Sequence, residues 1–148
     1  MITHTSLMVF LLVLASLICL GKTFHLQVVS ELTGGHLLFV QCTINDDDLG
    51  IQYLRAGENV SWPIKISLKD TVLFSCDIRK NKGHARVTVL FAEIYSDINF
   101  WLLEKCNWET CSWIAKDDGI YLRNIPERSD DRTQHWEPKP YCIDHNNC

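Results

Sequence analysis

Apolar and polar residues alternate with a period of two along the middle of the chain, which is typical of β-strands buried on one face. In TVLFSCDI, residues 71–78, the apolar positions Val72, Phe74, Cys76 and Ile78 share one face. The same alternation, or a run of β-branched and aromatic residues, occurs in FHLQVV at 24–29, HLLFVQCTI at 36–44, IKISL at 64–68 and HARVTVLFAEIY at 84–95. These stretches are predicted to be the strands of a β-core.

Turn-forming residues separate the predicted strands at short intervals. Gly34 and Gly35 divide the first pair, RKNKG at 79–83 joins the next hairpin, and KDDGIY places Asp118 and Gly119 where a tight turn with positive φ is expected. No long helix, internal repeat or low-complexity segment is evident. The sequence therefore predicts an all-β fold, a small antiparallel β-sandwich or a partly closed barrel, and the sandwich is the fold class that we expect.

The first 21 residues contain no Asp, Glu, Lys or Arg and include the apolar run LMVFLLVLASLICLG. This run is too short and too close to the N-terminus for a membrane span, so residues 1–21 are predicted to be a secretory signal peptide cleaved before Lys22. No second stretch approaches about 18 apolar residues. We therefore expect a secreted, extracellular protein with no stable membrane insertion after cleavage.

The remaining chain has the length of one domain. The strand pattern continues to about Arg123, so residues 22–123 are predicted to form the β-sandwich domain and residues 124–148 a polar tail. The net charge is −4 and no basic stripe is present, which argues against a nucleic-acid partner.

Removing Cys19 with the signal peptide leaves six cysteines, an even number that in a secreted chain predicts three disulfides. They are Cys42, Cys76, Cys106, Cys111, Cys142 and Cys148. We expect Cys142 to pair with Cys148 within the tail. Because cross-links over long loops restrict the unfolded chain most, we expect Cys42 and Cys76 to bridge to Cys106 and Cys111, in either of two ways.

Four segments follow one another in a specific order along the chain: QCTINDDDLG at 41–50, LRAGENVSW at 54–62, DTVLFSC at 70–76 and CNWETCSWIAKDDGIY at 106–121. Taken together, they resemble the plant self-incompatibility S1 family, the secreted S-protein homologues. The similarity covers roughly residues 24–123. The chain departs from the usual family pattern at Gln41, at Ser75 and in the additional cysteine pair of the tail.

The resemblance implies a small secreted plant β-sandwich that acts as a protein ligand of a cell-surface receptor in cell–cell recognition or signalling. Two alternatives remain: a secreted glycan-binding, lectin-like module and a secreted hydrolase. The chain lacks HExxH, GxSxG, a phosphate-binding glycine loop and an HGLWP-like ribonuclease stretch. We therefore expect no enzyme activity, no catalytic residue and no cofactor.

The acidic run INDDDLG at 44–50 raises the question of a metal site. Aligned as a calcium loop with Gly50 at the sixth position, it places Leu49 and Ala56 where oxygen ligands are needed, so no metal is expected. Asp46, Asp47 and Asp48 are instead interpreted as a solvated turn whose side chains cap local backbone N–H groups.

In a sandwich the inward faces are committed to burial, so recognition is expected in the loops. The candidate recognition residues are Asp46, Asp47, Asp48, Lys80, Lys82, Trp101 and Trp108. Core packing is the alternative for the tryptophans and is favoured for Trp62 and Trp113. The N-x-S/T motif at Asn59 predicts N-glycosylation of the secreted chain.

Overall fold

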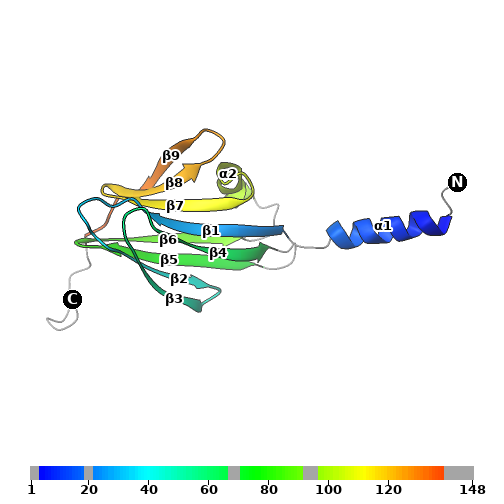
Figure 1. The fold of residues 1–148 in the computed structure, drawn as a ribbon, viewed down its shortest axis with the longest axis horizontal. Helices are drawn as coiled ribbons and strands as arrows, with labels where there is room; N and C mark the ends of the chain where they lie inside the picture. The colour runs from blue at the N-terminus through cyan, green and yellow to red at the C-terminus, as the bar shows by residue number, and fades with distance from the viewer. Residues whose placement is uncertain (1–3, 19–21, 67–70, 92–96, 139–148) are drawn as a thin grey trace.

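Two β-sheets packed face to face form the body of the protein (Figure 1). The computed structural model describes residues 4–18, 22–66, 71–91 and 97–138. The five-stranded sheet has the order β4-β1-β7-β8-β9 and the four-stranded sheet the order β3-β2-β5-β6. The elements are α1 (His4–Ile18), β1 (Lys22–Ser30), β2 (Leu38–Ile44), β3 (Asp47–Leu54), β4 (Asn59–Ile66), β5 (Val72–Lys80), β6 (Gly83–Phe91), α2 (Asp97–Lys105), β7 (Thr110–Lys116), β8 (Gly119–Asn124) and β9 (Ser129–Gln134).

The strand pairs are antiparallel with one exception, the parallel pair β1 and β7. Val28 of β1 lies opposite Trp113 of β7 in this pair. A parallel neighbour requires a long connection, and here the chain passes through the other sheet and α2 before it returns as β7. The predicted small all-β sandwich is confirmed.

The core lies between the sheets and is built from the alternating apolar residues of the sequence. In β5, Val72, Phe74, Cys76 and Ile78 are buried, as the period-two pattern predicts. The ring of Phe74 lies 6.0 Å from that of Trp62 and 5.9 Å from that of Trp113, measured between centroids. The prediction that Trp62 and Trp113 pack in the core is therefore confirmed, with Trp113 buried and Trp62 partly buried.

Three of the expected turns occur where the sequence places them. Gly34 and Gly35 have φ of 71° and 72°, and Lys82 in the β5–β6 turn has φ of 65°. Asp117 and Asp118 form the β7–β8 turn, but Gly119 is already the first residue of β8 and does not have positive φ. Glycine is needed there for another reason: a Cβ atom would lie 2.4 Å from the backbone oxygen of Gln134 in β9.

Three elements depart from the sequence prediction. Strand β3 was not predicted, because its side chains are exposed except at Leu49 and Leu54 and show no alternation. Strand β9 lies in the segment expected to be a tail, so the expectation that strands end near Arg123 is wrong. Helix α2 occupies part of a segment expected to be a loop, and Leu102 and Leu103 are buried there.

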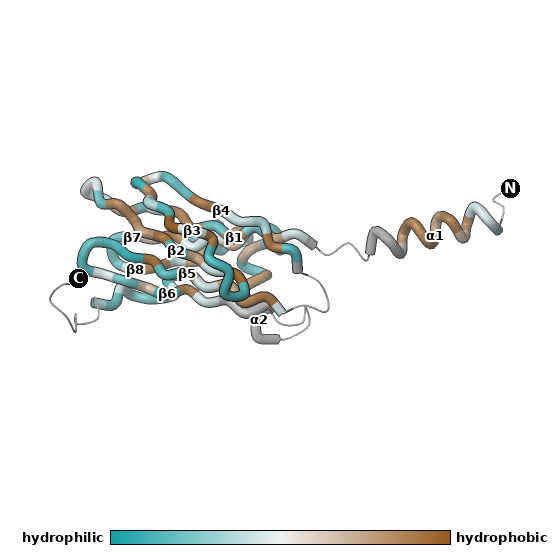
Figure 2. Tube along the Cα trace, turned by 90° about the horizontal axis from the view of Figure 1, so that it is seen from below, coloured by the Kyte–Doolittle hydropathy of each residue, from teal (hydrophilic) through white to brown (hydrophobic). Residues whose placement is uncertain are grey.

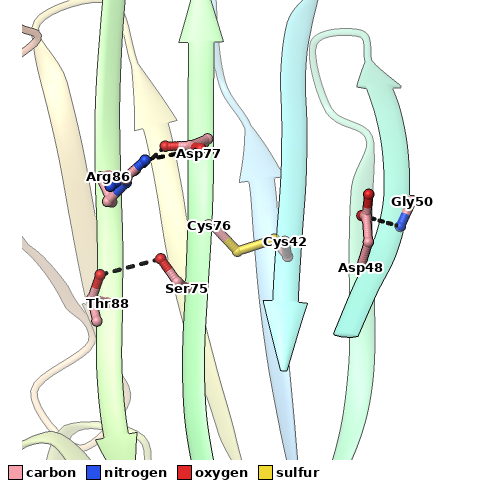
Figure 3. Close-up of a disulfide and its surroundings, with 8 residues drawn as sticks. All are labelled: Cys42, Asp48, Gly50, Ser75, Cys76, Asp77, Arg86 and Thr88. Carbon is pink, nitrogen blue, oxygen red and sulfur yellow. Dashed lines mark hydrogen bonds and ion pairs between the residues drawn. A yellow bond between two sulfur atoms is a disulfide. The ribbon is translucent and has the colours of Figure 1, made fainter. Parts of the chain in front are cut away.

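The expected long-range disulfide pairing is also wrong. Cys42 bonds to Cys76 and Cys106 bonds to Cys111. Register explains the first bond, because Cys42 of β2 and Cys76 of β5 are directly opposite each other in one sheet (Figure 3). The second closes the connection between α2 and β7. Cys142 and Cys148 lie outside the described residues, so their pairing stays a prediction.

Helix α1 carries the apolar run that was interpreted as a signal peptide, and Figure 1 shows it apart from the sandwich. Hydropathy is high along this helix and, in the sandwich, alternates along the strands (Figure 2). The side chains from Leu7 to Leu14 are exposed. Among the residues that the structure describes, no helix has both the length and the apolar character needed to cross a bilayer. Signal cleavage stays a prediction.

Candidate functional site

The candidate recognition residues lie at the two opposite ends of the sandwich. The acidic turn between β2 and β3 is beside the start of β5, where the backbone N–H of Asn45 donates to the oxygen of Leu73 at 2.8 Å. Lys80 and Lys82 lie at the other end of β5, in the β5–β6 hairpin, which Figure 1 shows away from α1 and α2. We call these the helix end and the lysine end. The candidate residues therefore do not form one continuous surface.

At the helix end, the acidic run is divided between a turn and a strand. Asn45 and Asp46 form the turn with φ of 49° and 68°, whereas Asp47 and Asp48 already belong to β3. The predicted capping is confirmed for Asp48 alone, whose Oδ1 atom accepts a hydrogen bond from the backbone N–H of Gly50 at 2.8 Å (Figure 3). Within the described ranges, no group of three or more His, Cys, Asp or Glu side chains is suited to a metal ion.

The two tryptophans proposed as anchors differ in exposure. Trp101 on α2 is 51% exposed, and the Nζ atom of Lys105 lies 5.9 Å from its ring centroid. Trp108 is partly buried and packs against the core. Of the two, Trp101 is the side chain with a large surface available to a partner.

At the lysine end, three connections surround a cleft of about 420 Å³. The connections are the β1–β2 loop, the β5–β6 hairpin and the β7–β8 turn. The residues lining the cleft are Leu32, Thr33, Gly34, His36, Lys80, Asn81, Lys82 and Asp117. Both polar and apolar groups line the cleft, and its lining includes the two lysines of the β5–β6 hairpin.

Hydrogen bonds between Thr33 and Asp117 join the β1–β2 loop to the β7–β8 turn. The Thr33 hydroxyl donates to Asp117 Oδ2, and the Thr33 backbone N–H donates to Asp117 Oδ1 at 3.0 Å. The side-chain bond, followed by the backbone bond and the charges of Lys80 and His36, holds the pKa of Asp117 below its usual value. The carboxylate therefore stays ionised and its oxygens are occupied by Thr33.

Lys80 and Trp136 connect the β5–β6 hairpin to the β7–β8 turn. Lys80 Nζ donates to the backbone oxygen of Asp117 and lies 5.0 Å from the ring centroid of Trp136. The indole N–H of Trp136 donates to the backbone oxygen of Lys116 at 2.7 Å. These contacts hold the three connections in one arrangement before any partner binds.

Lys82 is the cation of the cleft that remains available. Its side chain is exposed, and it makes no ion pair with any residue in the described ranges. Lys80, by contrast, is held by Asp117 and Trp136. A pre-formed cleft with one uncommitted ammonium and the exposed imidazole of His36 is suited to binding an anionic group such as a carboxylate.

Sequence reasoning found Lys80 and Lys82 but missed Thr33, His36, Asp117 and Trp136. The Asp117–Asp118 turn was visible in the sequence as KDDG. Nothing in the sequence indicates that this turn lies against Thr33, which is 84 positions away.

A second charged cluster covers the outer face of the five-stranded sheet. Lys116 Nζ lies 2.8 Å from Asp130 Oδ2, and Arg123 Nε donates to Asp130 Oδ1 at 3.1 Å. Partial burial, the largest influence, raises the pKa of Asp130, but the hydrogen bonds from Lys116 and Arg123 outweigh it and the pKa lies below its usual value. These side chains are engaged with one another, so we assign the cluster to stability.

The predicted glycosylation site is accessible. Asn59 is exposed and is the first residue of the edge strand β4. Its Oδ1 atom accepts a hydrogen bond from Gln27 Nε2 at 3.1 Å, which leaves Nδ2, the atom to which an N-linked glycan would attach, out of that bond. Glycosylation at Asn59 stays a prediction.

Comparison with known proteins gives concordant matches. The family model described as "Plant self-incompatibility protein S1" matches residues 25–136. The chain is similar to S-protein homolog 1 of Arabidopsis thaliana, with 32% identity over 114 residues that cover 77% of this chain and 72% of that protein. S-protein homolog 74 of the same plant is 31% identical with the same coverage.

A solved structure shares the fold. It matches with a TM-score of 0.54 and 20% sequence identity, covering 79% of this chain and 96% of that chain. Its title describes self-incompatibility protein homologues as a widespread family of small, highly stable, secreted proteins from plants. At this identity, the similarity supports the fold alone.

Proposed function

Because this chain belongs to the plant self-incompatibility protein S1 family, we propose that it is a secreted protein ligand that binds a receptor on the surface of plant cells. The solved relative belongs to a family described as secreted. The apolar segment before Lys22 is consistent with export. The family description supports a role in recognition between cells.

The observation that carries the proposal is the pre-formed cleft at the lysine end. Binding loses affinity when loops must be ordered on contact, so a cleft whose loops are already fixed is suited to recognition. Here Thr33, Asp117, Lys80 and Trp136 connect three loops through hydrogen bonds and a cation–π contact. Lys82 then presents a charge that these internal contacts do not use.

The chemistry of the cleft defines the expected receptor contact. An exposed lysine beside a histidine pairs with a carboxylate, so we propose that an acidic side chain of the receptor enters the cleft and binds Lys82. The Thr33–Asp117 connection positions the loops and makes no direct contact with the receptor in this proposal.

The test measures binding of the labelled secreted protein to receptive plant cells. We expect Lys82→Glu to weaken binding about tenfold or more, because an attraction becomes a repulsion. Lys65→Glu is the matched control, since Lys65 is also exposed but lies on strand β4. Circular dichroism confirms that both variants fold.

Two results would overturn the proposal. If Lys82→Glu and Lys65→Glu both bind as the parent does, the cleft is not the recognition site. If protease treatment of the cells leaves binding intact while removal of surface glycans abolishes it, the partner is a glycan and the lectin-like alternative replaces the protein receptor.

A further inference from the structure

Outside the two helices, the exposed large apolar side chains are concentrated on one side of the sandwich. Among the described residues they are Leu37, Ile51, Tyr53 and Leu73, which belong to β3, to β5 or to the loop that leads into β2. These strands form the four-stranded sheet, whereas the outer face of the five-stranded sheet carries the charged cluster around Asp130. Exposed apolar side chains that gather on one face mark a surface that another molecule covers.

Strand register places two of these side chains on the same outer face as Phe39 and Arg79. Tyr53 of β3 lies opposite Phe39 of β2, and Phe39 lies opposite Arg79 of β5. Directly opposite residues point to the same side of a sheet, and so do residues two positions apart on one strand. Ile51 therefore shares this face with Tyr53. The register shift between β2 and β3 begins beyond Gln41, nearer the helix end, and leaves these positions in step. We call Phe39, Ile51, Tyr53 and Arg79 the outer patch.

Arg79 is the cation of the outer patch, and it lacks an acidic partner. Its Cζ atom lies 5.2 Å from the ring centroid of Phe39, whose ring meets that of Tyr53 edge-on at 5.6 Å between centroids. The side chain of Arg79 is exposed and makes no ion pair with any residue in the described ranges. The acid of the same strand, Asp77, is held by Arg86, whose Nε atom donates to Asp77 Oδ1 at 2.9 Å (Figure 3). A partner that covers the patch therefore has to supply a carboxylate, because burial of an unpaired charge is unfavourable.

The composition of the outer patch fits a protein better than a glycan or a lipid surface. Tyrosine and arginine are enriched where protein interfaces carry most of their binding energy. A glycan would place hydroxyl groups against Ile51 and Leu37, whose side chains have no hydrogen-bonding group to offer in return. Anionic lipid surfaces are recognised by clusters of about four or more cations, whereas the outer patch contains Arg79 alone.

The outer patch adjoins the cleft at the lysine end. Arg79 directly precedes Lys80, which lines the cleft, and Phe39 is three positions from the cleft residue His36. One strand residue advances about 3.3 Å, so a single protein surface is able to cover both places. Arg79 and Lys82 are then met by separate carboxylates of the same partner.

We propose that the receptor docks against the outer patch, with apolar side chains over Tyr53 and Ile51 and a carboxylate on Arg79. This inference rests on the proposed function, because the same receptor places another acidic side chain in the lysine-end cleft. The patch supplies the apolar centre of the interface, and the cleft supplies part of its polar rim. Recognition is therefore assigned to a sheet face as well as to the loops, and the helix end stays outside the contact.

Two patch variants test the proposal through binding of the labelled secreted protein to receptive plant cells. We expect Tyr53→Ala to weaken binding at least about tenfold, because it removes the aromatic group that the partner covers. Arg79→Glu should weaken binding by a similar factor, because a carboxylate then faces a carboxylate. Arg79→Lys should weaken it less, because the charge is kept.

The matched controls are Trp101→Ala and Arg128→Glu. Trp101 is an exposed aromatic residue on α2. Arg128 is an exposed arginine in the β8–β9 turn, where the backbone N–H of Ile125 donates to the oxygen of Lys105 at the end of α2. Both controls lie at the helix end and should bind like the parent. Circular dichroism and thermal unfolding confirm that each variant folds, and equal weakening by the controls would overturn the proposal.

The results separate this inference from the proposed function. If Lys82→Glu weakens binding while Tyr53→Ala and Arg79→Glu bind like the parent, the outer patch is not part of the interface. The inference then fails, although the receptor proposal stands. If the two patch variants weaken binding and Lys82→Glu does not, the outer patch is the docking surface and the cleft is not.

Three further results would assign the outer patch to another partner and overturn the inference. Binding that survives protease treatment of the cells but still depends on Tyr53 identifies a partner that is not a protein. Binding of the parent, but not of Arg79→Glu, to vesicles that contain phosphatidylserine identifies a lipid surface. Sedimentation of the parent as a dimer that Tyr53→Ala abolishes identifies a second copy of this chain.

Discussion

Removal of each disulfide should reveal how much each one restricts the unfolded chain. The compared variants are Cys42→Ala with Cys76→Ala, and Cys106→Ala with Cys111→Ala. The first bond spans 34 positions and the second spans 5. The chain-entropy relation then gives about 3.8 kcal/mol for the first bond and about 2 kcal/mol for the second.

Loss of the sulfur atoms from the core has a cost of its own. All four cysteines have no exposed surface, so each double variant leaves two small cavities in a buried region. That cost is expected to be similar in the two variants, since the same atoms are deleted. The difference of roughly 2 kcal/mol between the variants therefore reports the difference in loop length.

Guanidinium unfolding followed by tryptophan fluorescence measures the effect, since Trp113 is buried beside Phe74. The Cys42 and Cys76 variant should unfold at the lower denaturant concentration. It should also have the steeper transition, because its unfolded state is more expanded. A Cys106 and Cys111 variant that loses as much stability or more would refute the loop-length reasoning. Peptide mapping without reduction checks the pairing itself.

Two further predictions concern single positions in the five-stranded sheet. Gly119→Ala should destabilise the protein by about 1–3 kcal/mol. The new Cβ atom would lie 2.4 Å from the backbone oxygen of Gln134 in β9, and no side-chain rotation relieves this clash. An unchanged thermal unfolding midpoint would contradict the prediction. For Asp130, partial burial raises the pKa, but the hydrogen bonds from Lys116 and Arg123 lower it more, so the folded value is below the unfolded one. The associated stability is present above the unfolded pKa and is lost as pH falls from about 5 through the folded pKa. Asp130→Asn should therefore reduce stability at pH 7 and flatten its dependence on pH between about 5 and 2, and an equally steep acid transition in the variant would count against the assignment.

Much of the four-stranded sheet and its turns is determined by the sequence alone. Val72, Phe74, Cys76 and Ile78 alternate because each must avoid water on the same side of the strand, and this requirement is local. Turn residues act locally too, since Gly34 and Gly35 have no Cβ atom and adopt positive φ without a steric penalty. The combined spacing of the cysteines, tryptophan and acidic turn was sufficient to indicate the family.

Other elements depend on the partners that the tertiary structure supplies. The polar strand β9 is held at the sheet edge, where Asp130 meets Lys116 and Arg123, so it needs no apolar alternation. Strand β3 pairs with β2 but has mostly exposed side chains on both faces, so a period-two pattern does not reveal it.

Contacts between distant residues are decided by register, which a local pattern does not contain. The pairing of β2 with β5 places Cys42 beside Cys76, whereas loop length alone favoured a longer bridge. The cleft at the lysine end forms because the β1–β2 loop and the β7–β8 turn meet when β1 and β7 pair in parallel. The sequence by itself thus determined the strands with an alternating pattern and identified Lys80 and Lys82. The tertiary structure decided which residues lie together, because a residue's hydrophobicity and turn preference act at its own position, while proximity depends on how whole strands align.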